Sequence, residues 1–209
     1  MIELHSKTAL LHRQLRRALQ SGRYLPGQRI DPAALAREFK ASTTPVRQAL
    51  YRLVGEHLIE DQARNGFVVP LPSEIALRNL YDWMERLLVM ACDIGVAELV
   101  RQSGRVTPVP ANGDPVKRTW KLFDAVAHAT AHHPLHQAVR QANDRLAPIR
   151  RAKHHLLTSA DDELDALAHH WERGDTAALR HEVRAYHARR KQLVPCIVAV
   201  LIESSGRLH

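Results

Sequence analysis

Residues 24–70 constrain the fold more than any other part of this 209-residue chain. Pro32 can begin a helix without losing an amide partner, and apolar residues then recur at helical spacing up to Phe39. A four-residue turn follows. We expect the chain to restart there as a helix, with the Thr44 hydroxyl as N-cap and Pro45 at the first helical position. The pattern predicts two short helices joined by a tight turn.

The next part of this stretch changes from helical to strand-like spacing. The second helix has an apolar face and a polar face, whereas residues 58–59 and 67–69 are β-favouring runs. Asn65 and Gly66 lie between these runs and form a strong hairpin signal. With a first helix over residues 3–21 closing the core, the stretch predicts a winged helix-turn-helix, a fold that reads duplex DNA.

The polar face of the second helix and the hairpin tip hold the candidate DNA contacts. Amides and cations at the start of such a helix suit phosphates, and its side chains suit base edges in a major groove. Arg47 is the best single candidate for a base or phosphate contact. The complete candidate set is Ser42, Thr43, Thr44, Arg47, Gln48, Tyr51, Arg52, Arg64, Asn65 and Gly66.

The charge distribution agrees with a nucleic-acid partner. The chain has a formal net charge of +8, and its first 70 residues carry 11 basic and 6 acidic side chains. Positive charge is therefore concentrated on the smaller domain, where binding to DNA would release counterions from the phosphates. An ordinary solvated basic surface would give the same counts.

The chain is long enough for two domains, which we place at residues 1–71 and 74–209. Ser73 predicts the N-cap of a long helix over residues 74–100, and residues 102–115 are rich in proline and glycine and should be irregular. Further helices are expected at residues 116–132, 134–158 and 159–173, and a last one begins at Asp175 and is kinked by Pro195. The second domain should be an antiparallel all-helical bundle.

The sequence favours a cytoplasmic protein without a membrane partner. No secretory signal follows Met1, and the longest apolar run, residues 193–202, is too short to span a bilayer. Cys92 and Cys196 lie among apolar neighbours and have no metal-ligand spacing. We expect both to be buried free thiols in a reducing compartment.

The first third of the chain resembles the DNA-binding domain of the GntR family of bacterial transcription regulators. The residues in register with the family pattern are Leu25-Pro26-Gly27, Leu35-Ala36, Ser42, Thr44-Pro45-Val46-Arg47, Ala49-Leu50, Arg52-Leu53, Glu56, Leu58 and Gly66. Pro32-Ala33 and Thr43 replace positions that commonly supply two DNA-touching cations. The resemblance implies a homodimeric, effector-responsive regulator, most often a repressor, bound to an inverted-repeat operator in double-stranded DNA.

The second domain resembles a shortened FCD-type effector domain of the FadR-like branch. The resemblance depends on Asp124 and His128, four residues apart, on the Gly174-Asp175 junction and on His187. It implies that Asp124, His128 and His187 hold a divalent metal such as zinc, which helps to bind a small carboxylate effector. The family's third histidine is Leu164 here, and His132 or His169 could compensate.

Several alternatives stay open for this second domain. Asp124 and His128 could be a hydrogen-bonded pair without a metal, and a decayed pocket would leave a metal-free DNA-binding regulator. Arg150 and Lys153 could attract an anionic effector or could belong to a solvated face. A metal-dependent enzyme is a further alternative, but the chain has no HExxH frame, phosphate-cradling glycine loop or GxSxG elbow. We therefore expect a protein that is not an enzyme.

Overall fold

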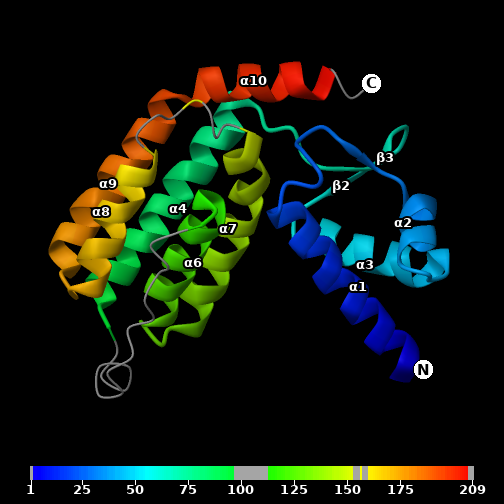
Figure 1. Cartoon of the computed structure of the whole chain (residues 1–209), viewed down its shortest axis with the longest axis horizontal. Coiled ribbons are helices and arrows are strands. Elements are labelled where there is room, and N and C mark those ends of the chain that lie inside the picture. The colour runs from blue at the N-terminus through cyan, green and yellow to red at the C-terminus, as the bar shows by residue number, and fades with distance from the viewer. Residues whose placement is uncertain (1, 97–112, 153–155, 157–159, 207–209) are drawn as a thin grey trace.

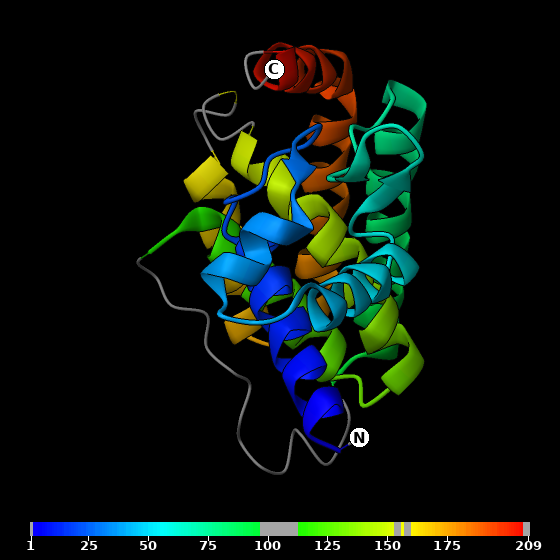
Figure 2. The same cartoon turned by 90° about the vertical axis from the view of Figure 1, so that its right-hand side faces the viewer.

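The computed structural model describes residues 2–96, 113–152, 156 and 160–206, with side chains from residue 7 onward. Within these residues the chain is mostly helical and has one small sheet (Figure 1). A small amino-terminal group of elements lies against one side of a larger helical bundle (Figures 1 and 2). The predicted fold class, a winged helix-turn-helix followed by a helical bundle, is confirmed.

The amino-terminal group consists of helices packed on an antiparallel sheet with the strand order β1-β3-β2. Its elements are α1 (Ile2–Gln20), β1 (Arg29–Ile30), α2 (Pro32–Glu38), α3 (Thr43–Gly55), β2 (Glu60–Gln62) and β3 (Gly66–Val68). Strand β1 pairs Arg29 with Val68 and Ile30 with Phe67. The sequence did not predict β1, because two residues are too few to show the alternation of a strand.

The two helices of the helix-turn-helix begin differently from each other. The Asp31 carboxylate accepts a hydrogen bond of 2.9 Å from the Ala33 amide and caps α2, which begins at Pro32 as predicted. Helix α3 begins at Thr43 with Ser42 as N-cap, so the predicted cap at Thr44 is wrong. Proline fits any position of the first turn, since amides there have no partner within the helix, and Pro45 therefore did not locate the start.

The wing is also shifted slightly from its predicted position. Leu58 and Ile59, which we expected in a strand, are buried in the core before the strand begins. Strand β2 starts at Glu60, and the turn through Asn65 leads into β3 as predicted. The core beneath these elements unites one face of α1 and α3 with the sheet; its buried members include Leu11, Leu15, Leu35, Val46, Leu50, Leu53, Ile59 and Phe67.

The described residues of the carboxy-terminal bundle form helices and the turns that connect them (Figure 1). Its helices are α4 (Glu74–Ile94), α6 (Pro115–His128), α7 (His133–Ala152), α8 (Ala160–Glu172), α9 (Thr176–Gln192) and α10 (Val194–Gly206). The Ser73 hydroxyl caps α4 and the Asp175 carboxylate caps α9, both as predicted. Buried apolar side chains from all six helices form one core, which includes Leu77, Met84, Leu88, Leu122, Val139, Leu146, Leu167, Val183 and Ile197.

Several helix ends differ from the sequence-based expectation; α6, for example, ends at His128 and not at residue 132. Helix α4 ends at Ile94, before the predicted end at residue 100, because Gly95 adopts a φ of +75°, which a helix does not allow; residues 97–100 lie outside the described residues. The chain turns at Leu193 and starts α10 anew, so Pro195 lies in the first turn of a separate helix and does not kink α9. The stretch 102–115 lies largely outside the described residues.

Two further findings bear on the sequence-based expectations. Cys92 is buried as predicted, but Cys196 is exposed on α10, so the expectation of two buried thiols is wrong. Apolar neighbours in sequence did not bury Cys196, because it lies on the outward side of its helix. No helix among the described residues is long and apolar enough to cross a membrane.

Helix α10 extends from the bundle toward the amino-terminal domain (Figure 1). Its Ser205 packs so closely on Gly27 that a Cβ added there would lie 2.6 Å from the serine Cβ. Gly27 also has a φ of +85°, which side-chain-bearing residues rarely adopt. The carboxy-terminal helix and the turn before β1 therefore meet at a position that only glycine suits.

Candidate DNA-binding surface and polar core of the bundle

The predicted contact residues on α3 lie on the surface of the winged helix. Nine of the ten candidates are exposed, and Gly66 is half-buried at the hairpin turn. Buried Val46, Ala49, Leu50 and Leu53 hold the opposite face of α3 in the core, which turns the polar face outward. This geometry leaves the face of α3 free to contact another molecule.

Phe67 of the wing joins the hairpin to this face of α3. The Tyr51 ring meets the Phe67 ring edge to face at 5.2 Å between centroids, and the Arg47 guanidinium lies 5.7 Å from the same ring. These contacts restrict the Arg47 side chain while its charge stays exposed. Gln48 turns the other way, because its amide oxygen accepts a hydrogen bond of 3.1 Å from Thr8 of α1.

The three predicted metal ligands do not converge. Asp124 accepts a hydrogen bond of 2.8 Å from His136 of α7, and Arg140 lies 3.5 Å from the same carboxylate oxygen. His128 is exposed, with its ring 5.1 Å from the His136 ring, whereas His187 is fully buried. No group of three or more His, Cys, Asp or Glu side chains in the described part of the chain is arranged to hold a metal ion.

The other residues considered for this metal site are also occupied elsewhere. Leu164, at the position of the family's third histidine, is part of the apolar core. His132 accepts a hydrogen bond from the Leu135 amide at 3.2 Å, and the His169 ring packs against that of His170. Asp124 does form a hydrogen-bonded pair with a histidine, but the histidine is His136 and not His128.

A cluster of polar side chains lies in the middle of the bundle, where the sequence favours apolar packing. Arg150, His187 and Arg190 are 5%, 0% and 2% exposed. The Arg150 and His187 side chains lie 5.5 and 5.9 Å from the Phe123 ring centroid. Arg190 lies over the Tyr186 ring at 3.4 Å. We call this set, with Asn143, Glu163 and Tyr81, the polar core.

The electrostatics of the polar core keep His187 uncharged. Burial, together with the positive charges of Arg150 and Arg190, lowers the pKa of His187 to about 3. Its Nδ1 lies 2.7 Å from the Val183 carbonyl oxygen, to which it must donate. The Nε2 of the neutral ring is then a lone-pair acceptor, and it has no hydrogen-bond partner among the described residues.

The two predicted effector-binding residues have different outcomes. Arg150 belongs to the polar core, so the alternative of a solvated face is wrong for this residue. Lys153 lies outside the described residues. The next residue, Arg151, is not part of the polar core, because it forms an ion pair with Asp114.

A second buried carboxylate connects the two domains. Asp144 of α7 is 2% exposed and accepts hydrogen bonds from Arg16 Nε at 2.6 Å, Gln20 Nε2 at 2.5 Å and Trp120 Nε1 at 2.7 Å. Arg16 and Gln20 lie on α1, and Trp120 on α6. Arg16 also approaches Glu56, which pairs with His12 at 2.9 Å. Asp144 therefore fixes the first helix of the winged helix on the bundle.

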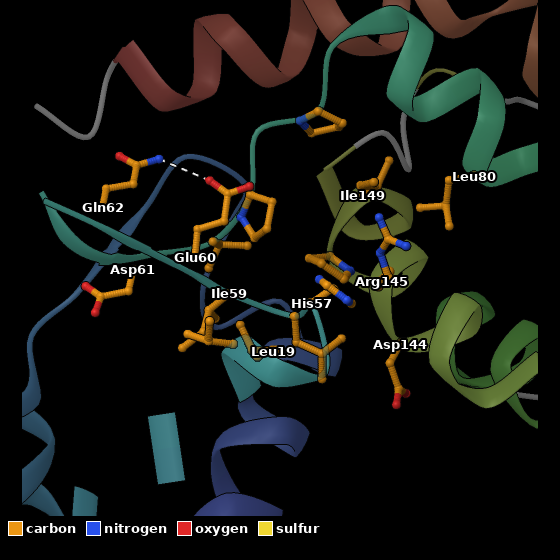
Figure 3. Close-up of a pocket in the computed structure, with 16 residues that line it drawn as sticks. Leu19, His57, Ile59, Glu60, Asp61, Gln62, Leu80, Asp144, Arg145 and Ile149 are labelled. Carbon is orange, nitrogen blue, oxygen red and sulfur yellow. Dashed lines mark hydrogen bonds between the residues drawn. The ribbon is translucent and has the colours of Figure 1, made fainter. Parts of the chain in front are cut away.

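A cleft of about 460 Å³ lies beside this contact, between the wing and the bundle. Figure 3 shows Glu60, Asp61 and Gln62 on its wing side and Leu80 and Ile149 on its bundle side. The wing is thus separated from the bundle along part of the interface, while α1 is held firmly.

Asn143, Asp144 and Arg190 were not predicted from the sequence, although Asn143, like Arg150, left a signal there. Helix α7 carries an apolar stripe of core residues, Leu135, Val139, Ala142, Leu146 and Ile149. Asn143 and Arg150 fall along that stripe at helical spacing, seven residues apart. Polar residues at core positions of an amphipathic helix were therefore a readable sign of a buried site.

Comparison with known families identifies the amino-terminal domain. Residues 8–69 match the model of the family described as bacterial regulatory proteins, gntR family. The amino-terminal domain is a GntR-type winged helix. The match runs from α1 to the end of the wing and stops before α4, so the FCD-type identity of the bundle stays a prediction.

Two curated relatives align with the GntR-type domain. The HTH-type transcriptional regulator YdhC of Bacillus subtilis is 34% identical over 58 residues, which is 28% of this chain and 26% of YdhC. The Nta operon transcriptional regulator of Aminobacter aminovorans is 37% identical over 59 residues, 28% of each chain. The aligned part thus spans little more than a quarter of the length of these relatives.

Solved structures resemble the chain over both domains. E. coli McbR/YncC superposes with a TM-score of 0.66 at 18% identity, covering 90% of this chain and 96% of that chain. A transcriptional regulator GntR from Rhodococcus sp. RHA1 gives 0.69 at 16% identity, covering 90% and 97%. These likenesses show that the combination of a GntR-type domain with a helical domain is a shared fold.

Proposed function

We propose that this protein is a sequence-specific DNA-binding transcription regulator of the GntR type that acts as a repressor. The proposal rests above all on the exposed face of α3, where Arg47 and Tyr51 are held beside the wing by Phe67. A helix presented in this way fits a major groove, and the wing fits the adjacent backbone. The curated relatives that align with this domain are named as transcriptional regulators, which supports the same function.

The proposal predicts a strong effect of Arg47→Ala on DNA binding. Loss of one cation that contacts a base should weaken binding by about 1–3 kcal/mol, or about 5- to 150-fold. The measurement is fluorescence anisotropy on a duplex selected from a random library by the wild-type protein. Arg180→Ala, which removes the same charge from the bundle surface, should change the affinity much less. Equal affinities for both folded variants, or no duplex selected at low salt, would contradict the proposal.

We propose further that two copies act together on an inverted repeat, as twofold symmetry requires. Helix α4 exposes Trp83, Met90 and Ile94, which are 50%, 50% and 47% exposed and spaced seven and four residues apart. Residues at this spacing form one stripe, and a stripe of large apolar side chains on a surface suits a second copy of the same helix. Leu80, Met84, Leu87, Leu88 and Ala91 of the same helix are occupied within the monomer core.

A charge placed on this stripe should separate the dimer. Trp83→Glu would bury a carboxylate in an apolar interface, so we expect light scattering to find the 23.6 kDa monomer at micromolar concentration. Leu10→Glu, a similar change at an exposed leucine of α1, should leave the dimer intact. A wild-type protein that is already monomeric under these conditions would contradict the dimer.

We also propose that a small carboxylate in the bundle changes operator affinity. A ligand can do so only if it favours one arrangement of the two domains over another. The contacts supply a connection, because Asn143 accepts a hydrogen bond from Arg150 and donates one to the Trp120 carbonyl at 2.8 Å. Its neighbour Asp144 holds α1. Adjacent residues of α7 thus contact the polar core and the winged helix.

A further inference from the structure

We propose that the guanidinium of Arg150 binds a small organic carboxylate inside the bundle without the help of a metal ion. This site deepens the proposed effector response, on which its regulatory meaning rests. The binding chemistry itself depends only on the residues of the polar core, and it can be tested apart from DNA.

The free edge of Arg150 has the geometry of a carboxylate site. Its Nη1 donates a hydrogen bond of 2.6 Å to the Asn143 amide oxygen, which holds the planar group in place. Its Nε and Nη2 are buried and have no hydrogen-bond partner in the described part of the chain. These two atoms form one side of the guanidinium, and their N–H groups match the two oxygens of a carboxylate.

The charge balance of the polar core also favours an anion. The described groups around Arg150 are the Asn143 amide, the Phe123 ring and the Tyr81 and Tyr186 side chains, together with the positive charge of Arg190, and none of them is a carboxylate. The nearby acid Glu163 is already paired with Arg190 and with Arg189, the latter at 2.5 Å. A buried cation without a counterion is costly, so a carboxylate at its free edge would stabilise the folded protein.

The same surroundings disfavour a metal ion at this place. His187 Nε2 offers a lone pair, but Arg150 and Arg190 put two positive charges beside it. The predicted acidic ligand, Asp124, is held by His136 and Arg140 at a position 28% exposed. A divalent cation would be repelled by the arginines, whereas an organic anion would be attracted.

The test measures the thermal stability of the full chain in the presence of acetate, benzoate and succinate, with chloride at matched ionic strength. We expect at least one carboxylate to raise the Tm saturably, by about 5–10 °C at one hundred times its Kd, with or without EDTA. Calorimetry should give one site per chain. A response that EDTA abolishes, or one that chloride reproduces, would overturn the proposal.

Variants of Arg150 separate ligand binding from a structural role. Arg150→Met should raise the Tm of the ligand-free protein, because it removes an unpaired buried charge, and should abolish the carboxylate response. Arg150→Lys keeps the charge without the two-pronged edge and should bind at least tenfold more weakly. Arg180→Met should respond like the wild type. The proposed site would be wrong if Arg150→Met kept the full carboxylate response. It would also be wrong if the wild type showed no response and Arg150→Met had a lowered Tm.

The two proposals can fail separately. Anisotropy on the selected duplex is measured for the wild type and for Arg150→Met without carboxylate, and both should bind. An Arg150-dependent carboxylate response in a protein that binds no duplex would leave the anion site standing and remove the regulator. DNA binding without any carboxylate response would support the regulator and remove the anion site.

Discussion

Asp144→Ala should lower the free energy of unfolding by about 3–5 kcal/mol, the usual cost of removing one partner of a buried ion pair. The change leaves Arg16, Gln20 and Trp120 without their shared acceptor at the junction of the two domains. Arg16 keeps only its longer approach of 3.7 Å to Glu56. Urea unfolding monitored by circular dichroism measures the loss. We expect the winged helix to unfold at lower urea concentration than the bundle in this variant.

Controls distinguish this buried contact from an ordinary surface ion pair. Asp93→Ala removes an exposed carboxylate whose partner is Arg180, and it should cost less than about 1 kcal/mol. Asp144→Asn keeps an acceptor oxygen and loses the charge, so its effect should be intermediate. If Asp144→Ala and Asp93→Ala cost the same, the junction is held by other contacts.

Glu163→Leu should be equally destabilising, by about 3–5 kcal/mol, because it leaves the guanidinium of Arg190 buried without its anion. Arg190→Met alone should also destabilise the folded protein, because Glu163 would lose its buried partner and keep only the more exposed Arg189. The double variant Glu163→Leu with Arg190→Met removes both charges and should cost much less than the sum. Chemical denaturation of the four proteins completes the cycle.

The result would also bear on the polar core. Additive losses in the cycle would show that the two side chains do not act as a pair. A stable double variant that still responds to carboxylates would show that Glu163 and Arg190 are separate from the Arg150 site. If the double variant is stable but its Tm no longer responds to carboxylates, then the Glu163–Arg190 pair belongs to the Arg150 site.

Local features were predictable where neighbouring residues decide the backbone. Pro32 marked the start of α2, Asn65 and Gly66 marked the hairpin turn, and Ser73 marked the start of α4. In each case the two interacting groups lie within four residues of each other, so a short stretch of sequence is enough to predict the contact. The exposed face of α3 was predictable for a related reason, because helical period alone separates its apolar and polar sides.

The polar sites of the bundle were not predictable in the same way. Asp124 was expected to act with His128 and His187, but its partner is His136, which comes from the next helix. Cys196 was expected to be buried and is exposed. Both outcomes depend on how each helix is rotated against its neighbours, and that rotation is set by packing of the whole core.

The sequence by itself determined a GntR-type winged helix, its outward recognition face and a helical second domain, because caps, turn residues and hydrophobic period act over a few residues. Only the tertiary structure decided that Arg150 lies inside the bundle with its Nε and Nη2 unpaired among the described residues, and that Asp144 fixes α1 across the domain junction. Those arrangements join residues far apart in the chain, and the free energy that selects them is shared among all the helices that pack together.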